Sequence, residues 1–366
     1  MRYIDEYRNP ELLKKIVSSI QAESTKEVRL MEVCGTHTVA IFRSGIKNIL
    51  PKNISLISGP GCPVCVTPNL DIDTAIEIAK LDDVIFTTFG DMIRVPGSFS
   101  NLENERANGA DVRVVYSSLD ALNIANHNPD RKVVFFGIGF ETTSPTIASA
   151  ILSAQNKGVR NFFVLSSHKL IPPAMKMLLE AGEVKIDGFI CPGHVSTIIG
   201  SKVYDFIAEE YNVPCAIAGF EPIDILQAIL MLIRQINDGK PKVEIGYSRA
   251  VRPEGNITAL NILNDVFDIS DARWRGFGIV PSSGLTVKDK YCQFDAKKVF
   301  IVNVEPENEP KGCLCGEVLR GVKTPIECAF FANSCTPDNP IGPCMVSSEG
   351  TCSSYFKYGK YSLHIP

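Results

Sequence analysis

The chain contains 366 residues, of which 45% are hydrophobic and 21% are charged, as in ordinary globular proteins rather than disordered or fibrous chains. Its 37 basic and 41 acidic residues give a formal net charge of -4. The chain therefore lacks the excess of positive charge that is typical of proteins that bind nucleic acid or anionic membranes. The 12 cysteines are too sparse over this length to form a disulfide scaffold.

The first predicted element is an amphipathic helix near the N-terminus. Asn9 is a suitable N-cap and Pro10 suits the first helical position. One apolar stripe then follows at Leu12, Leu13, Ile16, Val17 and Ile20. The acidic N-terminal segment argues against a signal peptide, and no apolar run approaches the roughly 18 residues of a membrane span. We therefore expect a cytoplasmic protein with reduced thiols, in which clustered cysteines indicate metal or redox chemistry.

Short apolar runs alternate with helical patterns along most of the chain. The runs are rich in Val, Ile and Phe without period-2 alternation, which is typical of strands buried on both faces of a parallel sheet. We expect strands at Val28–Val33, Ile54–Ser58, Val84–Thr88, Val112–Tyr116, Val133–Phe136, Phe162–Leu165, Gly188–Cys191 and Ala216–Ala218. Helical patterns fit between several of them, at Leu70–Lys80, Thr146–Gln155 and Pro173–Ala181. The predicted fold class is therefore α/β.

A partial internal echo favours two similar lobes. Gly139-Phe140-Glu141 follows one predicted strand and Gly219-Phe220-Glu221 follows another, although the spacing around them does not repeat. We expect two Rossmann-like lobes with parallel sheets, over residues 28–157 and 158–270. Residues 1–27 and 271–366 form a third region, whose C-terminal part is rich in Pro, Gly and Cys. Because such loop-rich sequence buries little apolar surface, we expect a metal centre to order it.

Small polar motifs follow the predicted strands, at the edge where parallel sheets bind ligands. Cys34–Thr38 (CGTHT) follows the first strand and Gly59–Cys65 (GPGCPVC) follows the second. Cys34 and His37 share one face if a helix begins there, so they can share a ligand. The alternative is a buried cysteine beside a hydrogen-bonded histidine. Glu141 and His194 lie in later turns and are candidates for proton transfer, although a structural role is as plausible for each.

Cys62 and Cys65 form a C-x-x-C pair at a predicted strand-to-helix turn. The N-terminus of a helix favours thiolate, which is the form that attacks disulfides and binds soft metals. The pattern therefore favours a redox or soft-metal pair. Two structural cysteines, or half of a zinc site without its second C-x-x-C, are the alternatives.

The C-terminal cysteines admit several groupings. One of them has the spacing C-x14-C-x6-C-x16-C and comprises Cys313, Cys328, Cys335 and Cys352. It leaves Cys315 and Cys344 as a second pair. Four thiolates suit either zinc or an iron–sulfur cluster. Structural zinc sites usually take ligands from short C-x2–4-C pairs, which this grouping lacks.

Taken together, the motifs resemble those of the HypD family of [NiFe]-hydrogenase maturation factors over essentially the whole chain. The resemblance rests on CGTHT, GPGCPVC, Phe89–Gly97 (FGDMIRVPG), Gly139–Thr143 (GFETT), Pro192–Ser196 (PGHVS) and the cysteine-rich tail with CMVSSEG. It implies a redox-active scaffold on which the Fe(CN)2CO unit of the hydrogenase active site is assembled. It also implies two partners, the chaperone HypC and the cyanide donor HypE.

The resemblance further implies roles for individual residues. A [4Fe-4S] cluster would be held by Cys313, Cys328, Cys335 and Cys352. Cys315 and Cys344 would form a redox pair beside it, and Cys62 and Cys65 a second pair. The iron of the nascent unit would bind Cys34 together with that second pair, while proton transfer or ligand orientation would fall to His37, Glu141 and His194. Two alternatives remain, an iron–sulfur-linked thiol–disulfide oxidoreductase not dedicated to hydrogenases and a zinc-stapled α/β binding protein.

Overall fold

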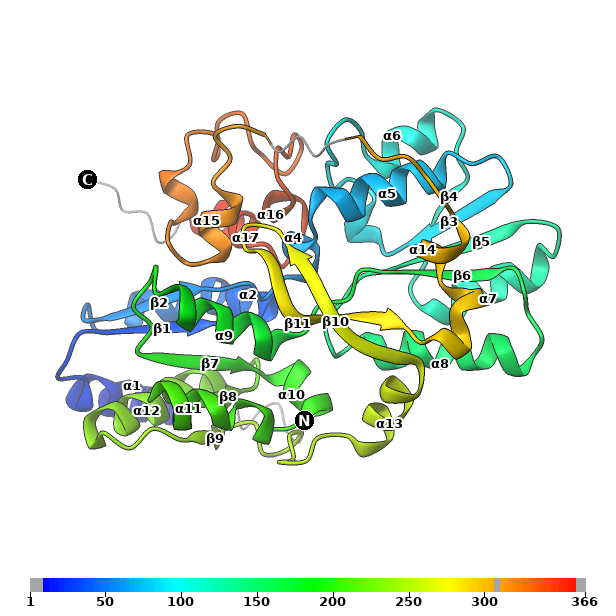
Figure 1. Cartoon of the computed structure of the whole chain (residues 1–366). Helices are drawn as coiled ribbons and strands as arrows, with labels where there is room; N and C mark the ends of the chain where they lie inside the picture. The colour runs from blue at the N-terminus through cyan, green and yellow to red at the C-terminus, as the bar shows by residue number, and fades with distance from the viewer. Residues whose placement is uncertain (1–8, 306–309, 360–366) are drawn as a thin grey trace.

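The computed structural model describes residues 9–305 and 310–359. Helix α1 (Pro10–Glu23) begins as predicted, because the Asn9 side chain accepts the backbone N–H groups of Glu11 and Leu12. Its buried residues, Ile16 and Ile20, belong to the predicted apolar stripe. The helix packs against α12 (Pro222–Asp238), so the N-terminal segment joins the lobe that contains α12 (Figure 1).

The first parallel sheet, called sheet A, has the strand order β2-β1-β7-β8-β9. The strand β1 (Val28–Glu32) lies between β2 (Ile54–Ser58) and β7 (Gly188–Pro192). β8 (Cys215–Ala218) and β9 (Val243–Ile245) continue the sheet beyond β7. All pairs are parallel, as the apolar runs predicted, and only β9 was not expected.

The second parallel sheet, called sheet B, has the order β4-β3-β5-β6. The strand β3 (Val84–Thr88) lies between β4 (Val112–Val114) and β5 (Lys132–Gly137), and β6 (Phe162–Ser166) pairs with β5. Every residue of β3 and β6 is buried. Their largely apolar sequence, without alternation of polar and apolar residues, follows from this burial on both faces.

Two parallel α/β lobes are thus confirmed, but the sheets do not divide the chain at residue 157. β6 belongs to sheet B, while β1 and β2 pair with β7 in sheet A. The chain therefore leaves sheet A after β2, builds sheet B, and returns at β7. In both sheets the first strand is internal, with the second strand on one side and the rest on the other, which is the doubly wound order found in flavodoxin-like folds.

The predicted echo does not mark equivalent places in the two sheets. Residues 139–141 follow β5, the third strand of sheet B in chain order, whereas residues 219–221 follow β8, the fourth strand of sheet A. The two sheets share a topology, but the repeated Gly-Phe-Glu sequence does not occupy equivalent positions in them.

Helices connect the strands and a hairpin joins the lobes. The helices predicted from periodicity are α5 (Asn69–Ala79), α8 (Ser144–Asn156) and α9 (Ile171–Ala181). The other connecting helices are α2 (Gly35–Arg43), α3 (Ile46–Ile49), α4 (Pro63–Val66), α6 (Leu102–Ala107), α7 (Ser118–His127), α10 (Gly193–Ile199) and α11 (Asp205–Tyr211). After them come α13 (Ile257–Val266), the antiparallel hairpin of β10 (Phe267–Trp274) and β11 (Gly278–Val287), and α14 (Ala296–Val299).

The cysteine-rich region, defined here as residues 310–359, forms a separate cap of short helices. They are α15 (Cys315–Leu319), α16 (Pro343–Val346) and α17 (Thr351–Tyr358). Figure 1 shows this cap, in orange and red, above β1 and β2 and beside the lobe of sheet B. The cap therefore lies where the two lobes approach each other.

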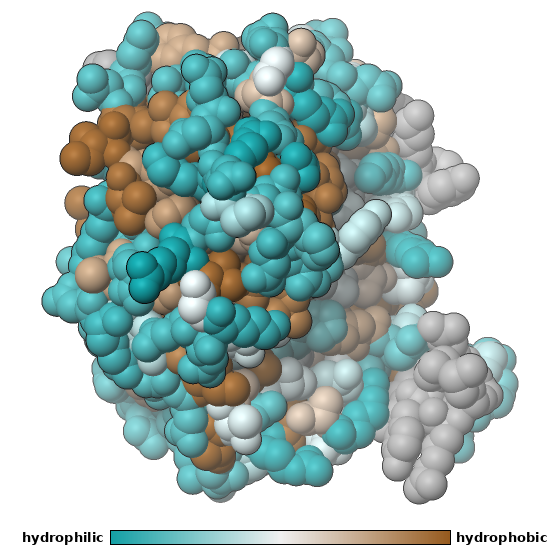
Figure 2. All heavy atoms as spheres, turned by 90° about the vertical axis from the view of Figure 1, so that its right-hand side faces the viewer, coloured by the Kyte–Doolittle hydropathy of each residue, from teal (hydrophilic) through white to brown (hydrophobic). Residues whose placement is uncertain are grey.

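One apolar core extends through both lobes and the cap. It includes Phe86 and Phe136 of sheet B, Phe189 of sheet A, and Cys315 and Cys344 of the cap. The outer face of the sheet B lobe is largely hydrophilic with scattered apolar side chains (Figure 2). Among the described residues, no helix has both the length and the apolar character needed to cross a bilayer.

Candidate functional site

Cys34 lies at the carboxyl end of β1, where it is the N-cap residue of α2. At β1 the order of sheet A reverses, with β2 on one side and β7 on the other, and parallel sheets bind ligands at such points. Burial raises the pKa of the Cys34 thiol to about 12, and the carboxylate of Glu349 adds to the increase. A thiol in these surroundings keeps its proton until a cation such as a metal ion replaces it.

The GPGCPVC loop packs directly against Cys34. The carbonyl of Gly61 accepts the backbone N–H of Gly35 at 2.8 Å, and a Cβ atom on Gly61 would lie 2.1 Å from the nitrogen of Cys34. Cys62 follows immediately as the N-cap of α4 and forms a disulfide with Cys65. The structure therefore brings these three cysteines into neighbouring loops at one edge of sheet A.

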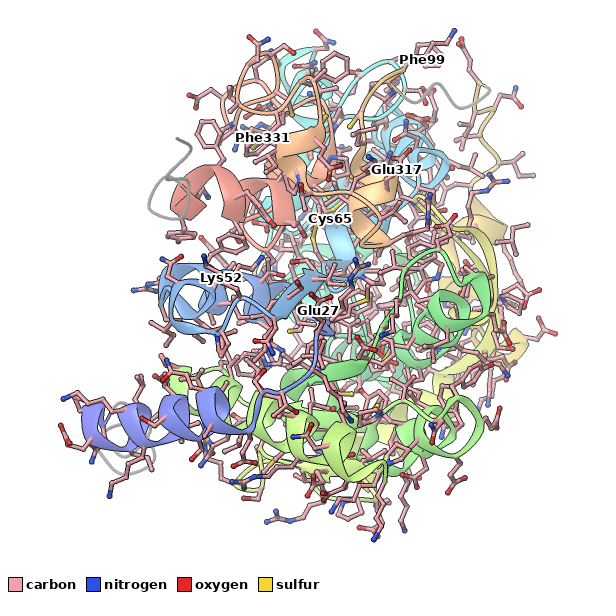
Figure 3. All side chains as sticks on the ribbon, turned by 90° about the vertical axis from the view of Figure 1, so that its left-hand side faces the viewer. Glu27, Lys52, Cys65, Phe99, Glu317 and Phe331 are labelled. Carbon is pink, nitrogen blue, oxygen red and sulfur yellow. A yellow bond between two sulfur atoms is a disulfide. The ribbon has the colours of Figure 1, made fainter. Side chains whose placement is uncertain are left out.

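The cysteine-rich region covers this edge. Helices α15 and α16 contact α4, and α17 contacts α2. Thr36 of CGTHT donates to the carboxylate of Glu349 at 2.6 Å, and Ser347 donates to Asp91 at 3.1 Å. Since Asp91 follows β3, one loop of the cap touches the carboxyl edges of both sheets. Figure 3 shows Cys65 beneath the helices of the cap. We use the name cysteine junction for Cys34, the loop with Cys62 and Cys65, and the helices of the cap that cover them.

Cys315 and Cys344 form a close pair of thiols inside the cap. Their sulfur atoms lie 3.0 Å apart, and both residues are buried. The pKa of Cys344 is raised well above its ordinary value by hydrogen bonds with Cys315 and Cys352 and by burial. Neighbouring thiols at this separation can form a disulfide after a small movement.

The other four cysteines of the cap also lie together. Burial raises the pKa of Cys313 to about 12, and the neighbouring thiols of Cys315, Cys328 and Cys352 add to the increase. The pKa of Cys335 is likewise raised by burial and then by Cys352 and Cys328. Cys313, Cys328, Cys335 and Cys352 are therefore electrostatic neighbours.

Four thiols without a short C-x2–4-C pair are a donor set of the kind that an iron–sulfur cluster uses. Across residues 9–305 and 310–359, no three His, Cys, Asp or Glu side chains are placed to hold a single metal ion. The backbone N–H of Ile341 donates to the sulfur of Cys335 at 3.4 Å, and hydrogen bonds of this kind tune iron–sulfur centres.

His37 and His194 meet at the ring of Phe220. The ring centroid of Phe220 lies 4.8 Å from that of His37 and 3.8 Å from that of His194. His37 is fully buried, and its Nε2 lies 2.9 Å from the carbonyl of Gly219. Burial lowers the pKa of His37 to about 4, so its ring is neutral near pH 7. These contacts direct His37 toward the loop after β8, whereas Cys34 packs against Gly61.

Glu141 lies in the loop after β5 and is buried against the start of α9. Its Oε1 accepts the backbone N–H of Ile171 at 2.9 Å, and Oε2 has no hydrogen-bond partner among the described residues. Burial raises the pKa of this carboxyl to about 7. A carboxyl that titrates near neutrality is suited to proton transfer, and its hydrogen bond to Ile171 holds it at the start of α9, the helix between β6 and β7.

Sequence reasoning missed two carboxylates of the junction, Glu349 and Glu32. Glu32 is buried on β1, where it accepts the backbone N–H of Cys34 at 3.0 Å and the hydroxyl of Thr38. Burial raises its pKa to about 7, and the hydrogen bonds with Thr38 and Cys34 partly oppose the increase. An acidic residue in a predicted strand, two residues before Cys34, was the available signal for Glu32.

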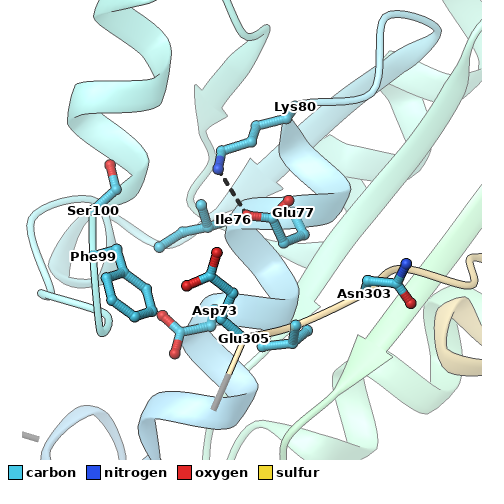
Figure 4. Close-up of a pocket in the computed structure, with 9 residues that line it drawn as sticks. Asp73, Ile76, Glu77, Lys80, Phe99, Ser100, Asn303 and Glu305 are labelled. Atoms are coloured by element: carbon cyan, nitrogen blue, oxygen red, sulfur yellow. Dashed lines mark hydrogen bonds and ion pairs between the residues drawn. The ribbon is translucent and has the colours of Figure 1, made fainter. Parts of the chain in front are cut away.

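A separate surface pocket lies beside α5, away from the cysteine junction. It has a volume of about 170 Å³ and is lined by Asp73, Glu77, Lys80, Phe99 and residues 303–305, among others (Figure 4). Asp73 already accepts the backbone N–H and the hydroxyl of Ser98, at 2.8 and 2.6 Å. Lys80 pairs with Glu77 at 2.7 Å. Because these polar groups satisfy one another and no cysteine lines the pocket, it contributes nothing to the site.

Two parallel α/β lobes, capped by a cysteine-rich region that meets a C-x-x-C pair, define the structural class of this protein. The family model HypD, described as "Hydrogenase formation hypA family", matches residues 11–359. The chain therefore belongs to the HypD family of hydrogenase maturation factors, as the motifs indicated.

Curated relatives are similar over nearly their whole length. Hydrogenase maturation factor HypD2 of Bradyrhizobium diazoefficiens is 49% identical over 374 residues, covering 100% of this chain and 98% of the relative. Hydrogenase maturation factor HypD of Azotobacter vinelandii is 47% identical over 369 residues, covering 98% and 97%. The protein of the same name from Cupriavidus necator is 46% identical over 371 residues, covering 99% and 98%.

Proposed function

We propose that this protein is a cytoplasmic scaffold on which the Fe(CN)2CO unit of [NiFe]-hydrogenases is assembled, in a transient complex with HypC and HypE. The observation that carries the proposal is the cysteine junction. Cys34, the Cys62–Cys65 disulfide and the Cys315/Cys344 thiols occupy loops and helices that contact one another. Family membership supports the link to hydrogenase, since the curated relatives are named as hydrogenase maturation factors.

The iron under construction is the substrate of this scaffold, and Cys34 is its proposed ligand together with Cys62 and Cys65. Thiolates make iron electron-rich, which suits cyanide and CO. Because burial holds the proton on Cys34, iron binding and proton loss are coupled there. Cys62 and Cys65 become available as ligands only after their disulfide is reduced.

Reduction of that disulfide is the proposed task of Cys315 and Cys344. The Cys344 thiolate attacks the Cys62–Cys65 bond, which forms a mixed disulfide and releases one thiolate. The Cys315 thiolate then attacks Cys344, which completes a Cys315–Cys344 disulfide and releases the second thiolate. Two electrons thus pass from the Cys315/Cys344 pair to the Cys62–Cys65 pair, and the two released thiolates take up the two protons that the attacking thiols lose before they react.

A resident iron–sulfur cluster would be held by Cys313, Cys328, Cys335 and Cys352, and when bound it would supply electrons singly. The chain's own contribution is to hold these thiols beside the Cys315/Cys344 pair. Glu141, His37 and His194 remain candidates for proton transfer, with His194 the one that is exposed to solvent.

Infrared spectroscopy of the protein isolated anaerobically with HypC tests the proposal. We expect cyanide and CO stretching bands in the wild type and their loss in Cys34→Ala, with cluster iron and sulfide retained. The matched control is Cys292→Ala, which changes an exposed cysteine outside the junction. Normal hydrogenase maturation with Cys34→Ala would refute the assignment. A wild type that reduces disulfides but shows no such bands would favour the thiol–disulfide oxidoreductase instead.

A further inference from the structure

The turn of the β10–β11 hairpin reaches the helix that carries the Cys62–Cys65 disulfide. The backbone N–H of Arg275 donates to the carbonyl of Val66, the residue after Cys65, at 2.8 Å. Arg275 is only 5% exposed. Figure 1 shows the yellow hairpin running from the lobes to the region of α4 and the cap. A segment distant in sequence therefore contacts the end of the disulfide-bearing helix.

The guanidinium group of Arg275 makes two further contacts beyond α4. Its Nε donates to the carbonyl of Thr67 at 3.1 Å, and its Nη2 donates to the side-chain oxygen of Asn69 at 2.6 Å. A planar guanidinium presents its N–H groups in a fixed fork, so this side chain fixes the direction in which the chain leaves α4. The position of the C-x-x-C helix thus depends on the hairpin.

The next residue of the turn contacts the other cysteine pair. Gly276 has a φ of +80°, and a Cβ atom there would lie 2.6 Å from the Cα of Gly316, the residue after Cys315. The carbonyl of Gly276 accepts a hydrogen bond from Arg320 at the end of α15. The hairpin turn is therefore in contact with α4 through one residue and with α15 through the next.

A small cavity marks the place where these segments meet. It has a volume of about 30 Å³, and its lining includes Asn69, Arg275, Cys313 and Cys315. A space of this size holds about one or two water molecules. The hairpin turn and the cysteines of the cap thus line the same small space, and closely packed segments of this kind transmit a displacement of the turn to both cysteine pairs.

We infer that Arg275 is a positioning residue that holds the two cysteine pairs in register for thiol–disulfide exchange. The inference rests on the proposed relay and adds to it the residue that sets its geometry. Exchange requires the attacking sulfur to approach the disulfide along a defined direction, and small displacements of reacting groups cost large factors in rate. The two-point contact of Arg275 with Thr67 and Asn69 supplies that constraint.

The test follows the Cys62–Cys65 disulfide directly in the full-length, cluster-containing protein. Dithionite is added under anaerobic conditions, samples are quenched with acid and alkylated, and mass spectrometry measures the disulfide remaining. Because Cys344→Ser lacks the attacking thiol, the rate at which its Cys62–Cys65 disulfide is reduced is the rate without the relay. Arg275→Lys retains the charge but cannot span both acceptors, so we expect internal exchange to slow about tenfold or more.

Two further substitutions separate positioning from general destabilisation. Asn69→Asp keeps an acceptor for the guanidinium and should retain the wild-type rate, whereas Asn69→Leu removes it and should slow exchange. The exposed neighbour Arg273→Lys serves as control. Reduction of Cys62–Cys65 by external dithiothreitol should be equal in all folded variants. If Arg275→Lys does not fold, the Asn69 pair decides the question.

The outcomes distinguish the inference from the function on which it rests. Wild-type exchange in folded Arg275→Lys or in Asn69→Leu would overturn the role of Arg275 alone. Equal slowing of internal exchange and of dithiothreitol reduction would do the same, because it would indicate a merely structural effect. A wild type that exchanges no faster than Cys344→Ser would instead overturn the relay itself.

Discussion

Burial, rather than pairing with opposite charges, sets the protonation of the key side chains. Removal from water raises the pKa of Glu32 and Glu141 to about 7 and lowers that of His37 to about 4. All three groups are therefore neutral in mildly acidic solution. Near neutral pH the two carboxyls are divided between charged and neutral forms, and the imidazole remains neutral.

The raised pKa of Glu141 predicts how the free energy of unfolding depends on pH. Its folded-state pKa of about 7 exceeds the ordinary value of 4.5, so the folded protein binds more protons than the unfolded chain between these values. The free energy of unfolding therefore falls as pH rises through that window. We expect Glu141→Gln to remove this contribution, which amounts to about 3 kcal/mol.

Chemical unfolding of wild type and Glu141→Gln at pH 4.5, 6 and 7.5 checks this expectation. The difference between the two free energies should shift in favour of the variant as pH rises. Glu209→Gln, at an exposed position of α11, provides the control and should show no such trend. A constant difference across the range would contradict the assignment of a raised pKa to Glu141.

At the scale of structural elements, the close packing of the loop between β2 and α4 against Cys34 leads to a prediction. A Cβ atom on Gly61 would lie 2.1 Å from the backbone nitrogen of Cys34, a contact that no rotamer change can relieve. Gly61→Ala should therefore cost about 2 kcal/mol and separate the two loops. Gly90→Ala is the matched control, since its nearest neighbour would be 3.6 Å away in ordinary contact.

Two measurements test this pair of glycine variants. Denaturant unfolding should show the loss of stability in Gly61→Ala only, and alkylation of Cys34 should become faster in the same variant as the loop moves away. Equal stability and equal alkylation rates for both variants would show that the close packing on Cys34 is unimportant.

The sequence revealed most clearly the elements whose burial is uniform. Val84–Thr88 matches its predicted bounds because this strand is buried throughout inside sheet B. Ile54–Ser58 also matches, although it is an edge strand of mixed burial. β10 was missed since most of its residues are at least partly exposed, and β9 has only three residues.

The sequence predicted the individual motifs of the site better than the contacts between motifs that are distant in the chain. Strand ends correctly indicated that Cys34 and the C-x-x-C loop belong to one edge of a sheet. The contact of Thr36 with Glu349 joins residues 313 positions apart, and local spacing carries no information about such a pair. The surroundings of His37 likewise depend on Phe220, which lies in the loop after β8 and is distant in sequence.

At the scale of the whole molecule, the continuous core predicts a single unfolding transition. The same apolar cluster includes residues of both sheets and of the cap, and α13 contacts both α8 and α10. Trp274, the only tryptophan in the sequence, is buried at the end of β10 and stacks near Phe140. Its fluorescence therefore reports on the point where the lobes and the hairpin meet.

We expect tryptophan fluorescence and far-ultraviolet circular dichroism to change at the same denaturant concentration. Coincident curves are the signature of lobes that lose structure together. A fluorescence change that precedes the loss of secondary structure would show that the hairpin and cap detach first, and would contradict a cooperative core.

The path of the chain through its two sheets also sets an order of events during synthesis. β1 and β2 leave the ribosome before the other strands, but their next neighbour in sheet A, β7, emerges only after all four strands of sheet B. Translation at about 5–20 residues per second leaves the first two strands waiting for several seconds. The lobe of sheet B can thus mature as a unit while the nascent N-terminal segment, with the CGTHT and GPGCPVC sulfurs, stays incomplete and open to chaperones.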